Sequence, residues 1–271
     1  MLISSVQNQK IKDLIKLQQK SRDRKKTGLL VAEGVQENLL ALQNGFEAER
    51  FFVCPDFFSD EELKQKLPEN QIFEITQEIF EKIAYRKTTG GILGVYKQKL
   101  NDLQDLKHIE NPLIVVLEQV EKPGNLGAIL RSADAAGADA VVVCDERVDF
   151  FNPNVVRSSV GTVFTNKIIA ANAQDFVQFC REQKIQILAT FLRDDTRDLF
   201  ACQMKVGTAL IFGTESTGLS DFWLKDVTHT IKIPMNGKVD SLNVSNAVAI
   251  CLYEAVRQRR GGYKKAPHIR M

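Results

Sequence analysis

The chain has 271 residues, of which 44% are apolar and 26% are charged, a composition typical of soluble proteins and long enough for two domains. No apolar run approaches the roughly 20 residues of a membrane-spanning helix, and the N-terminus lacks the apolar core of a signal peptide, so we expect a cytoplasmic protein. Five cysteines without a CxxC pair and three histidines without metal-ligand spacing predict neither disulfides nor a metal site.

The net charge of +2 conceals an uneven distribution of charge. Residues 1–28 contain eight Lys or Arg and two Asp, residues 255–271 contain six Lys or Arg and no acid, and the middle has 22 basic and 32 acidic residues. Clustered positive charge is typical of proteins that bind nucleic acid, because each cation near a phosphate releases a counterion. The alternative is that the basic ends only increase solubility; the helical pattern of the first segment favours nucleic acid.

The first hundred residues alternate between predicted helices and strands. A lysine-rich helix with an apolar stripe at Ile11, Leu14, Ile15 and Leu17 is expected to start at Ser4 or Ser5 and to end near Arg24. The elements expected after it are strand 29–32, helix 35–43, strand 51–53, helix 60–67, strand 72–75, helix 77–84 and strand 92–96. This alternation predicts a small α/β domain over residues 1–100 and a linker over residues 101–112.

The second part, residues 113–271, begins with a continuous apolar run over 113–117, which is typical of a strand buried on both faces of a parallel sheet. Further strands are expected at 140–144, 168–170, 185–191, 208–212 and 228–233. Helices are expected at 125–137, capped by Asn125, at 152–161, at 173–183, and at 243–260, capped by Ser241 or Asn243. The pattern predicts an α/β domain with a parallel sheet of about six strands.

Three short segments carry most of the unusual residues, and we expect each to be a loop beyond the carboxyl end of a strand. Segment 213–220, GTESTGLS, occupies the position of a phosphate loop, but Leu219 stands where such a loop requires lysine, which excludes an NTPase. No G-x-G-x-x-G is present to support dinucleotide binding. Segment 233–243, with Pro234 and Gly237, fits either a ligand-binding loop or an ordinary connection.

The three segments read NLGAILR at 125–131, GTESTGL at 213–219 and IPMNGKVDSLNVSNA at 233–247. In this order the pattern resembles the SpoU (TrmH-type) family of RNA ribose 2′-O-methyltransferases. The resemblance implies transfer of a methyl group from S-adenosylmethionine to a ribose 2′-hydroxyl, on a C-terminal parallel sheet that is threaded into a trefoil knot. It also implies a homodimer through that domain, to which helix 243–260 is suited.

The N-terminal segments LLVAEGVQENLLAL and GGILGVY resemble the L30e-like substrate-binding domain of many family members. Because L30e is a ribosomal protein, we expect 23S rRNA as the substrate. A tRNA ribose methyltransferase is the alternative within the family. A non-catalytic RNA-binding assembly factor is the alternative from another class.

The resemblance also implies a cofactor pocket. Its residues would be Thr190, Gly213, Glu215, Gly218, Ile233, Met235 and Leu242. The apolar members can enclose the adenine ring, and the glycines allow close approach of the backbone. The alternative for the apolar residues is ordinary core packing.

The catalytic positions implied by the resemblance are Asn125, Arg131, Glu215, Ser241 and Asn243. A guanidinium keeps its proton in proteins, so we expect Arg131 to stay charged, to hold a phosphate and to lower the pKa of the 2′-hydroxyl. Glu215 is either a general base or a carboxylate that holds its loop in shape. Asn125, Ser241 and Asn243 fit helix-capping and loop-fixing roles equally well.

Overall fold

The computed structural model describes residues 2–85, 90–120, 122–144, 149–191, 193, 196–214, 217–239 and 241–260. Their contacts divide the chain into two compact units. Unit 1 comprises Met1–Leu100, Lys122–Arg131 and Val148–Asn166, and unit 2 comprises Asn101–Glu121, Ser132–Arg147 and Lys167–Met271. Helix α6 (Pro123–Ala136) therefore begins in unit 1 and ends in unit 2.

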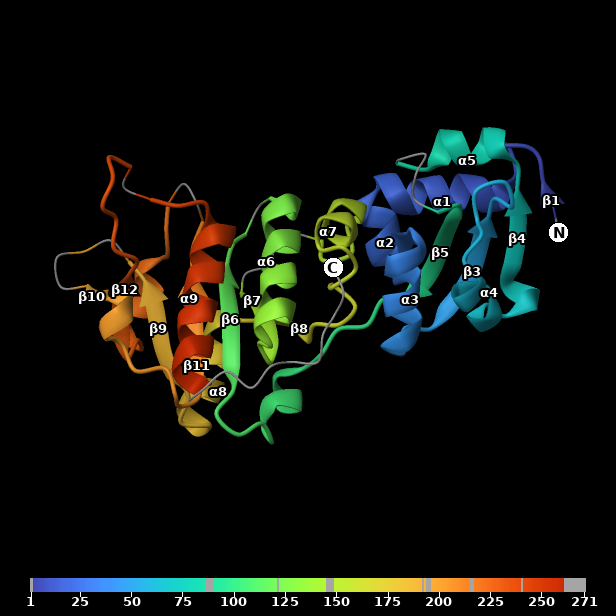
Figure 1. Cartoon of the computed structure of the whole chain (residues 1–271). Helices are drawn as coiled ribbons and strands as arrows, with labels where there is room; N and C mark the ends of the chain where they lie inside the picture. The colour runs from blue at the N-terminus through green and yellow to red at the C-terminus, as the bar shows by residue number, and fades with distance from the viewer. Residues whose placement is uncertain are drawn as a thin grey trace. The chain divides into compact units, whose positions relative to one another are not determined.

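Unit 1 is built on a five-stranded mixed sheet in the order β1-β4-β3-β5-β2 (Figure 1). Its strands are β1 (Leu2–Ile3), β2 (Leu29–Glu33), β3 (Ala48–Val53), β4 (Ile72–Ile75) and β5 (Ile92–Lys97). Its helices besides α6 are α1 (Gln9–Gln19), α2 (Ser21–Thr27), α3 (Val35–Gln43), α4 (Glu61–Lys66), η1 (Glu69–Gln71), α5 (Gln77–Ile83) and α7 (Pro153–Ser158).

Helices α1 and α5 pack on one face of this sheet (Figure 1). Their apolar residues form one buried cluster with Val31, Phe52 and Val95 of the strands. Since side chains alternate along a strand, the adjacent Phe51 and Tyr96 are directed to the opposite face. Helix α3 lies on that second face, because the hydroxyl of Tyr96 donates to the side-chain oxygen of Asn38 at 2.8 Å.

The side chain of Asn38 explains why residue 94, in the GGILGVY segment, is a glycine. Its buried amide donates to the carbonyls of Ala32 and Gly34, at 3.2 and 2.6 Å, while its oxygen accepts from Tyr96. A Cβ on Gly94 would lie 2.1 Å from that oxygen, so the position requires glycine. Pairing every polar atom of a buried amide avoids the desolvation penalty of an unmatched group.

Segment 149–166 belongs to unit 1 because its aromatic residues pack there. Phe151 and Phe164 lie edge-on to Phe46, with ring centroids 6.3 and 5.0 Å apart. The carboxylate of Asp149 accepts from the buried guanidinium of Arg24 at 2.7 Å. Apolar contacts and a charged hydrogen bond together hold this segment, including α7, against the sheet of unit 1.

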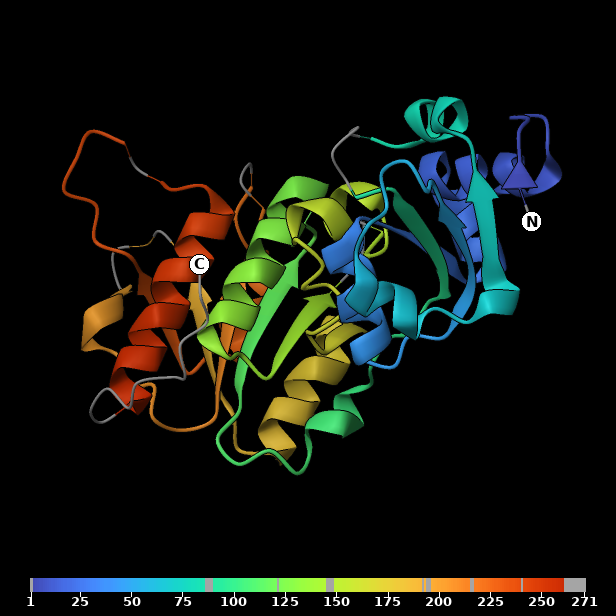
Figure 2. The ribbon, with the colours of Figure 1, turned by 45° about the vertical axis from the view of Figure 1, so that its right-hand side comes forward.

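Unit 2 contains a seven-stranded sheet in the order β10-β12-β9-β11-β6-β7-β8, in which every pair is parallel (Figure 2). Its strands are β6 (Leu113–Glu118), β7 (Ala140–Cys144), β8 (Ile168–Ala171), β9 (Gln186–Thr190), β10 (Arg197–Asp198), β11 (Thr208–Phe212) and β12 (His229–Lys232). Its helices besides α6 are η2 (Leu103–Leu106), α8 (Ala173–Glu182), η3 (Leu199–Ala201), η4 (Asp221–Lys225) and α9 (Val244–Arg259).

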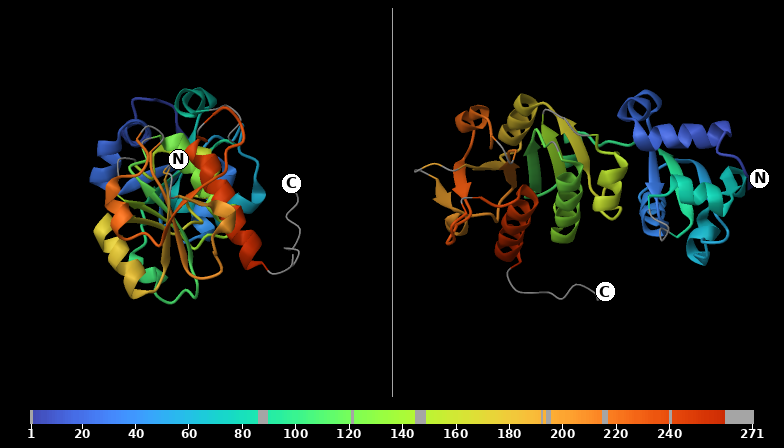
Figure 3. Two further views of the ribbon diagram at one scale, coloured as in Figure 1. Left: turned by 90° about the vertical axis from the view of Figure 1, so that its left-hand side faces the viewer. Right: turned by 90° about the horizontal axis from the view of Figure 1, so that it is seen from above.

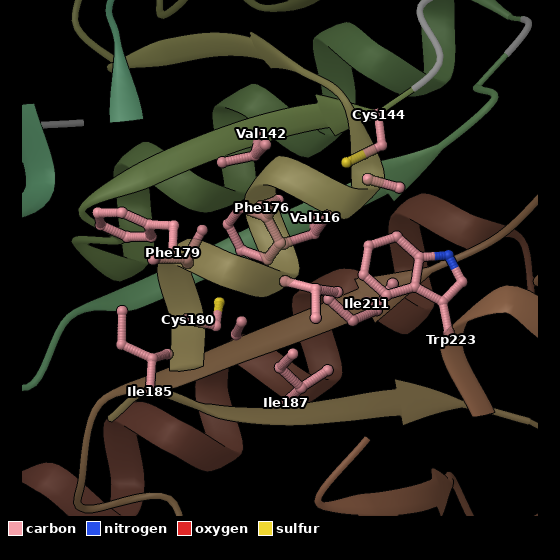
Figure 4. Close-up of a cluster of buried hydrophobic side chains, with 14 of the residues drawn as sticks. Val116, Val142, Cys144, Phe176, Phe179, Cys180, Ile185, Ile187, Ile211 and Trp223 are labelled. Atoms are coloured by element: carbon pink, nitrogen blue, oxygen red, sulfur yellow. The ribbon is translucent and has the colours of Figure 1, made fainter. Parts of the chain in front are cut away.

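Helices cover both faces of this sheet, with α8 on one side and α9 on the other (Figure 3). The α8 face is a buried cluster in which Phe176, Phe179 and Cys180 meet side chains of the central strands (Figure 4). The one tryptophan of the chain, Trp223, is fully buried in the same cluster. No helix among the described residues combines the length and the apolarity that crossing a membrane requires.

The predicted parallel sheet and most of its elements are confirmed, and three local predictions were wrong. The basic N-terminal segment forms two helices, because Lys20 is extended between α1 and α2. The cap of α1 is Asn8, whose side chain accepts from the N–H of Lys10, rather than Ser4 or Ser5.

The third wrong prediction concerns Asn125, which lies inside α6 instead of capping it. The helix begins at Pro123, and the carbonyl of Lys122 accepts from the N–H groups of Asn125 and Leu126. Proline suits the first helical position, because it has no N–H to satisfy and its φ is already helical. Segment 125–131 is therefore helix rather than a loop.

Two glycines of α6 differ in their surroundings, and this difference predicts different effects of alanine. A Cβ on Gly127 would lie 1.9 Å from the hydroxyl of Ser158 and 2.8 Å from the backbone nitrogen of Ser159, whereas a Cβ on Gly124 meets nothing within 4 Å. We expect Gly127→Ala to lower the free energy of unfolding by about 1–3 kcal/mol. Gly124→Ala should leave it unchanged or raise it by up to ~1 kcal/mol. Urea unfolding followed by circular dichroism measures both, and equal effects would contradict this packing.

Candidate active site

Several predicted cofactor residues of unit 2 meet at the carboxyl edge of its parallel sheet. Thr190 ends β9, Gly213 follows β11 and Ile233 follows β12. The strands end level with one another, since Thr190 is in register with Ile231 and Phe212 with Leu117. The carboxyl edge of an open parallel sheet is where α/β proteins place their ligands.

Backbone hydrogen bonds join the described residues of the loop after β11. Thr214 and Gly218 exchange two backbone hydrogen bonds of 3.2 and 3.1 Å, and the hydroxyl of Thr214 accepts from the N–H of Thr217 at 3.1 Å. A Cβ on Gly213 would lie 2.2 Å from the carbonyl of Gly218, so only glycine permits this approach. Glu215, predicted for both binding and catalysis, lies outside the described residues.

Glu118 is a residue of this edge that the sequence-based prediction missed. It ends β6 and is only 4% exposed, and its two oxygens accept from the N–H and the hydroxyl of Ser220, at 2.7 and 2.6 Å. Hydrogen bonds to a carboxylate are stronger than neutral ones, so this pair ties the far end of the 213–220 loop to the central strand. The available signal was a glutamate that closes the apolar run LIVVLE.

The side-chain hydroxyl of Thr190 makes a hydrogen bond to a neighbouring strand of the sheet. Its Oγ1 donates to the carbonyl of Ile211 at 3.0 Å, and the N–H of Phe191 donates to the carbonyl of Ile231 at 3.2 Å. Both bonds fix the end of β9 against its neighbours β11 and β12. Thr190 is consequently held in place as part of the edge.

The segment after β12 carries apolar side chains that are not fully buried. Ile233 and Met235 are half-buried, and Leu242 is 36% exposed. Core packing therefore does not account for Leu242. Accessible apolar side chains beside backbone polar groups form the kind of lining that binds a flat, partly polar ring.

Helix α9 is capped by Asn243, one of the two predicted caps. The side-chain oxygen of Asn243 accepts from the N–H and the hydroxyl of Ser245, at 3.0 and 2.6 Å. This cap fixes the point at which the 233–243 segment enters α9. Ser241 is exposed, two residues before the cap.

Asn125 and Arg131 lie on the part of α6 that belongs to unit 1. Asn125 is half-buried and Arg131 is exposed. The structure thus brings Thr190, Gly213 and Ile233 to one edge, whereas a shared site that also includes Asn125, Arg131 and Glu215 stays a prediction.

Metal ligation and thiol chemistry have no built site in the described part of the chain. No group of three or more His, Cys, Asp or Glu is arranged there to hold a metal ion. All five cysteines are buried, and burial raises the pKa of the Cys251 thiol to about 12. A thiol with so high a pKa is a poor nucleophile near neutral pH.

Comparison with protein families identifies the region that carries this edge. Residues 112–253, slightly more than half of the chain, match the SpoU rRNA Methylase family. The chain belongs to this family. Residues 8–94 match the MRM3-like substrate binding domain, which confirms the predicted combination of a SpoU domain with an N-terminal substrate-binding domain.

Curated relatives of the SpoU chain act on ribosomal RNA. This chain is 35% identical over 177 residues to the 23S rRNA (uridine(2479)-2′-O)-methyltransferase of Streptomyces viridochromogenes. The alignment covers 63% of this chain and 61% of the relative. The chain is 38% identical over 161 residues to the 23S rRNA (guanosine-2′-O-)-methyltransferase RlmB of Escherichia coli K12, covering 59% and 66%. The chain thus matches about three fifths to two thirds of the length of these relatives.

Solved structures share the whole fold of this SpoU chain. An AdoMet-bound rRNA methyltransferase from Sinorhizobium meliloti superimposes with a TM-score of 0.86 at 30% identity, covering 95% of this chain and 97% of that one. An RNA 2′-O ribose methyltransferase gives a TM-score of 0.82 at 34% identity, covering 96% and 99%. AviRb from Streptomyces viridochromogenes, in complex with AdoMet, gives 0.84 at 26% identity, covering 94% and 100%.

The Glu118–Ser220 contact predicts a graded loss of stability. Glu118→Gln replaces one acceptor oxygen by an NH2 group that faces a donor of Ser220, and should lower the free energy of unfolding by about 1–3 kcal/mol. Ser220→Ala removes only the hydroxyl bond and should cost about 0.5–1.5 kcal/mol. Fluorescence of Trp223, buried in η4 directly after this loop, reports urea unfolding. An equal or smaller effect of Glu118→Gln would contradict the anchoring role.

Proposed function

We propose that this chain is an RNA ribose 2′-O-methyltransferase that uses S-adenosylmethionine and acts on 23S rRNA. The observation that carries the proposal is the SpoU family match, which includes segments 213–219 and 233–243, directly after strands β11 and β12 of a parallel sheet. The names of the two curated relatives described above, both 23S rRNA 2′-O-methyltransferases, support this substrate. A substrate of this kind also fits a cytoplasmic protein.

The residues at the strand ends fit S-adenosylmethionine as the methyl donor. Ile233, Met235 and Leu242 offer partly exposed apolar surface for the adenine ring. The close approach of Gly213 to Gly218 brings backbone amides and carbonyls together after β11, and these groups would face the polar edge of the ring. When bound, the cofactor supplies a methyl group on a positively charged sulfur. Structures of AviRb and of the Sinorhizobium meliloti enzyme, both described with AdoMet, agree with this assignment.

The protein's own contribution to the chemistry is orientation and charge. Arg131 keeps its proton, so we assign it to holding the phosphate beside the target ribose and to stabilising the developing alkoxide. Asn125, Ser241 and Asn243 position the segments that surround the reacting atoms, and the cap made by Asn243 is one such contact. Glu215 is assigned either to proton acceptance or to the shape of its loop. Alignment of hydroxyl, methyl and sulfur accounts for much of the acceleration.

The N-terminal region, residues 1–100, is assigned to RNA binding, and residues 113–271 to catalysis, with 101–112 between them. Helices α1 and α2, together with Lys20 between them, expose six basic side chains: Lys12, Lys16, Lys20, Arg22, Lys25 and Lys26. Cations on one helical pair suit the phosphates of folded RNA. The match of residues 8–94 to a substrate binding domain supports the same assignment.

We also assign a homodimer through the knotted C-terminal domain. Helix α9 exposes Ile250 and Tyr253, at 36% and 53%, which is apolar surface that a second copy can cover. The knot itself rests on the family resemblance.

The activity is tested by transfer of labelled methyl from S-adenosylmethionine to unmodified 23S rRNA, 16S rRNA and bulk tRNA in parallel. We expect label on 23S rRNA alone. Arg131→Ala should lower the rate by about 10²–10³-fold, a typical effect of removing a group that stabilises developing charge. Arg181→Ala, which alters a 72% exposed arginine of α8, is the matched control and should leave the rate unchanged.

Other outcomes of this assay would overturn specific parts of the proposal. Label on tRNA alone would replace the substrate assignment. No label on any RNA, with binding retained in a gel shift, would favour a non-catalytic RNA-binding factor. A rate unaffected by Arg131→Ala would remove the role given to Arg131.

A further inference from the structure

Unit 1 contains a cavity of about 870 Å³ apart from the strand-end loops of unit 2. Its walls come from α1, from the β2–α3 junction, from the end of α5 and from α7, all of which belong to unit 1. The volume lies within the range of ligand-binding pockets, roughly 300–1,000 Å³. Nothing in the proposed methyl-transfer chemistry uses it.

One wall of the cavity is a flat stack of two side chains. The guanidinium carbon of Arg157 lies 3.5 Å from the ring centroid of Tyr85. Arg157 is held by a 2.6 Å hydrogen bond from its Nη2 to the side-chain oxygen of Asn154, and the N–H of Tyr85 donates to Glu33 at 2.8 Å. Tyr85 is nevertheless 63% exposed, so much of its ring stays accessible beside the guanidinium. Such aromatic and guanidinium planes are the surfaces on which unpaired RNA bases stack.

Two carboxylates, Glu33 and Glu37, line the same cavity. Burial raises the pKa of Glu37, and the nearby charge of Glu33 raises it further. The backbone N–H of Glu37 opposes this rise in pKa by favouring the charged carboxylate, and no side-chain donor to that carboxylate is found in the described part of the chain. A carboxylate only accepts hydrogen bonds, so a half-buried one with unused lone pairs favours a ligand that presents donors.

The combination of a stacking surface and a carboxylate selects among the RNA bases. Guanine is the only one of the four that presents two adjacent donors, N1–H and N2–H, which match the two oxygens of a carboxylate. Uracil presents one donor between two carbonyl oxygens, which a carboxylate repels. Adenine and cytosine each present one amino group beside a ring nitrogen that accepts. The chemistry of the cavity therefore favours guanine.

We propose that this cavity binds the guanine base of an unpaired nucleotide in the RNA substrate. The base stacks on the Tyr85–Arg157 pair and donates N1–H and N2–H to Glu37. The proposal rests on the proposed function in that it takes RNA as the substrate. It adds a site within unit 1 that recognises one base of the RNA. The substrate binding domain contributes some of its residues and α7 contributes the others.

The site is tested by fluorescence anisotropy with 5′-fluorescein RNA 11-mers bound to the full chain. The probes are ten uridines around one central guanosine, adenosine, cytidine, uridine, inosine or 7-deazaguanosine. We expect the guanosine probe to bind about tenfold more tightly than the adenosine, cytidine and uridine probes. Inosine, which lacks the N2 amino group, should be intermediate, and 7-deazaguanosine, which keeps both donors, should equal guanosine.

Variants assign the preference to the cavity. Glu37→Gln should abolish the preference for guanosine without changing the affinity for the uridine probe, whereas Glu61→Gln, at an exposed position of α4, should change neither. Tyr85→Leu should weaken guanosine binding by about tenfold, and Tyr85→Phe, which keeps the ring, should retain it.

Equal affinity of the wild-type chain for all probes, or a guanosine preference that survives Glu37→Gln, would overturn this inference. The assay needs no S-adenosylmethionine, so it separates the two proposals. A guanosine preference in a chain that transfers no methyl group would contradict the enzyme and support the site. Methyl transfer by a chain without the guanosine preference would support the enzyme and contradict the guanine site.

Discussion

The buried carboxylate of Glu118 is the contact on which the carboxyl edge of the parallel sheet depends. It closes β6, the strand between β11 and β7, and holds both the N–H and the hydroxyl of Ser220. The loop after β11 is thereby fixed at its far end, while the contact of Gly213 with Gly218 fixes its start. The two hydrogen bonds from Ser220 offset the cost of removing the Glu118 carboxylate from water. A fixed loop at the edge is what a preformed cofactor site requires.

Unit 1 shows how contacts can join segments that the sequence separates. The SpoU family match begins at residue 112, yet segment 149–166 packs against the sheet of the N-terminal residues. The rings of Phe46, Phe151 and Phe164 and the Arg24–Asp149 pair hold it there. This packing places α7, with Arg157, opposite Tyr85 and makes a cavity that neither segment forms alone.

Sequence patterns predicted the regular helices and strands of this structure. Apolar runs indicated the buried strands of unit 2, and helix 35–43 was predicted with its observed bounds. The two-residue strands β1 and β10 show no periodicity and were missed. Asn125 was misplaced because a cap and an internal helical asparagine look alike in sequence. Glu118 and the Tyr85–Arg157 stack depend on partners 102 and 72 positions away, which no local pattern reveals.

The central claim is that the loops at the carboxyl edge of the sheet hold S-adenosylmethionine, and calorimetric titration of that cofactor into the full chain tests it most directly. The wild-type chain and Arg181→Ala, which alters a 72% exposed side chain of α8 outside these loops, should bind with similar affinity. Gly213→Ala places a Cβ 2.2 Å from the carbonyl of Gly218 and should weaken binding at least about tenfold, which corresponds to ~1.4 kcal/mol. Undetectable binding by the wild-type chain, or unchanged binding by Gly213→Ala, would contradict the account.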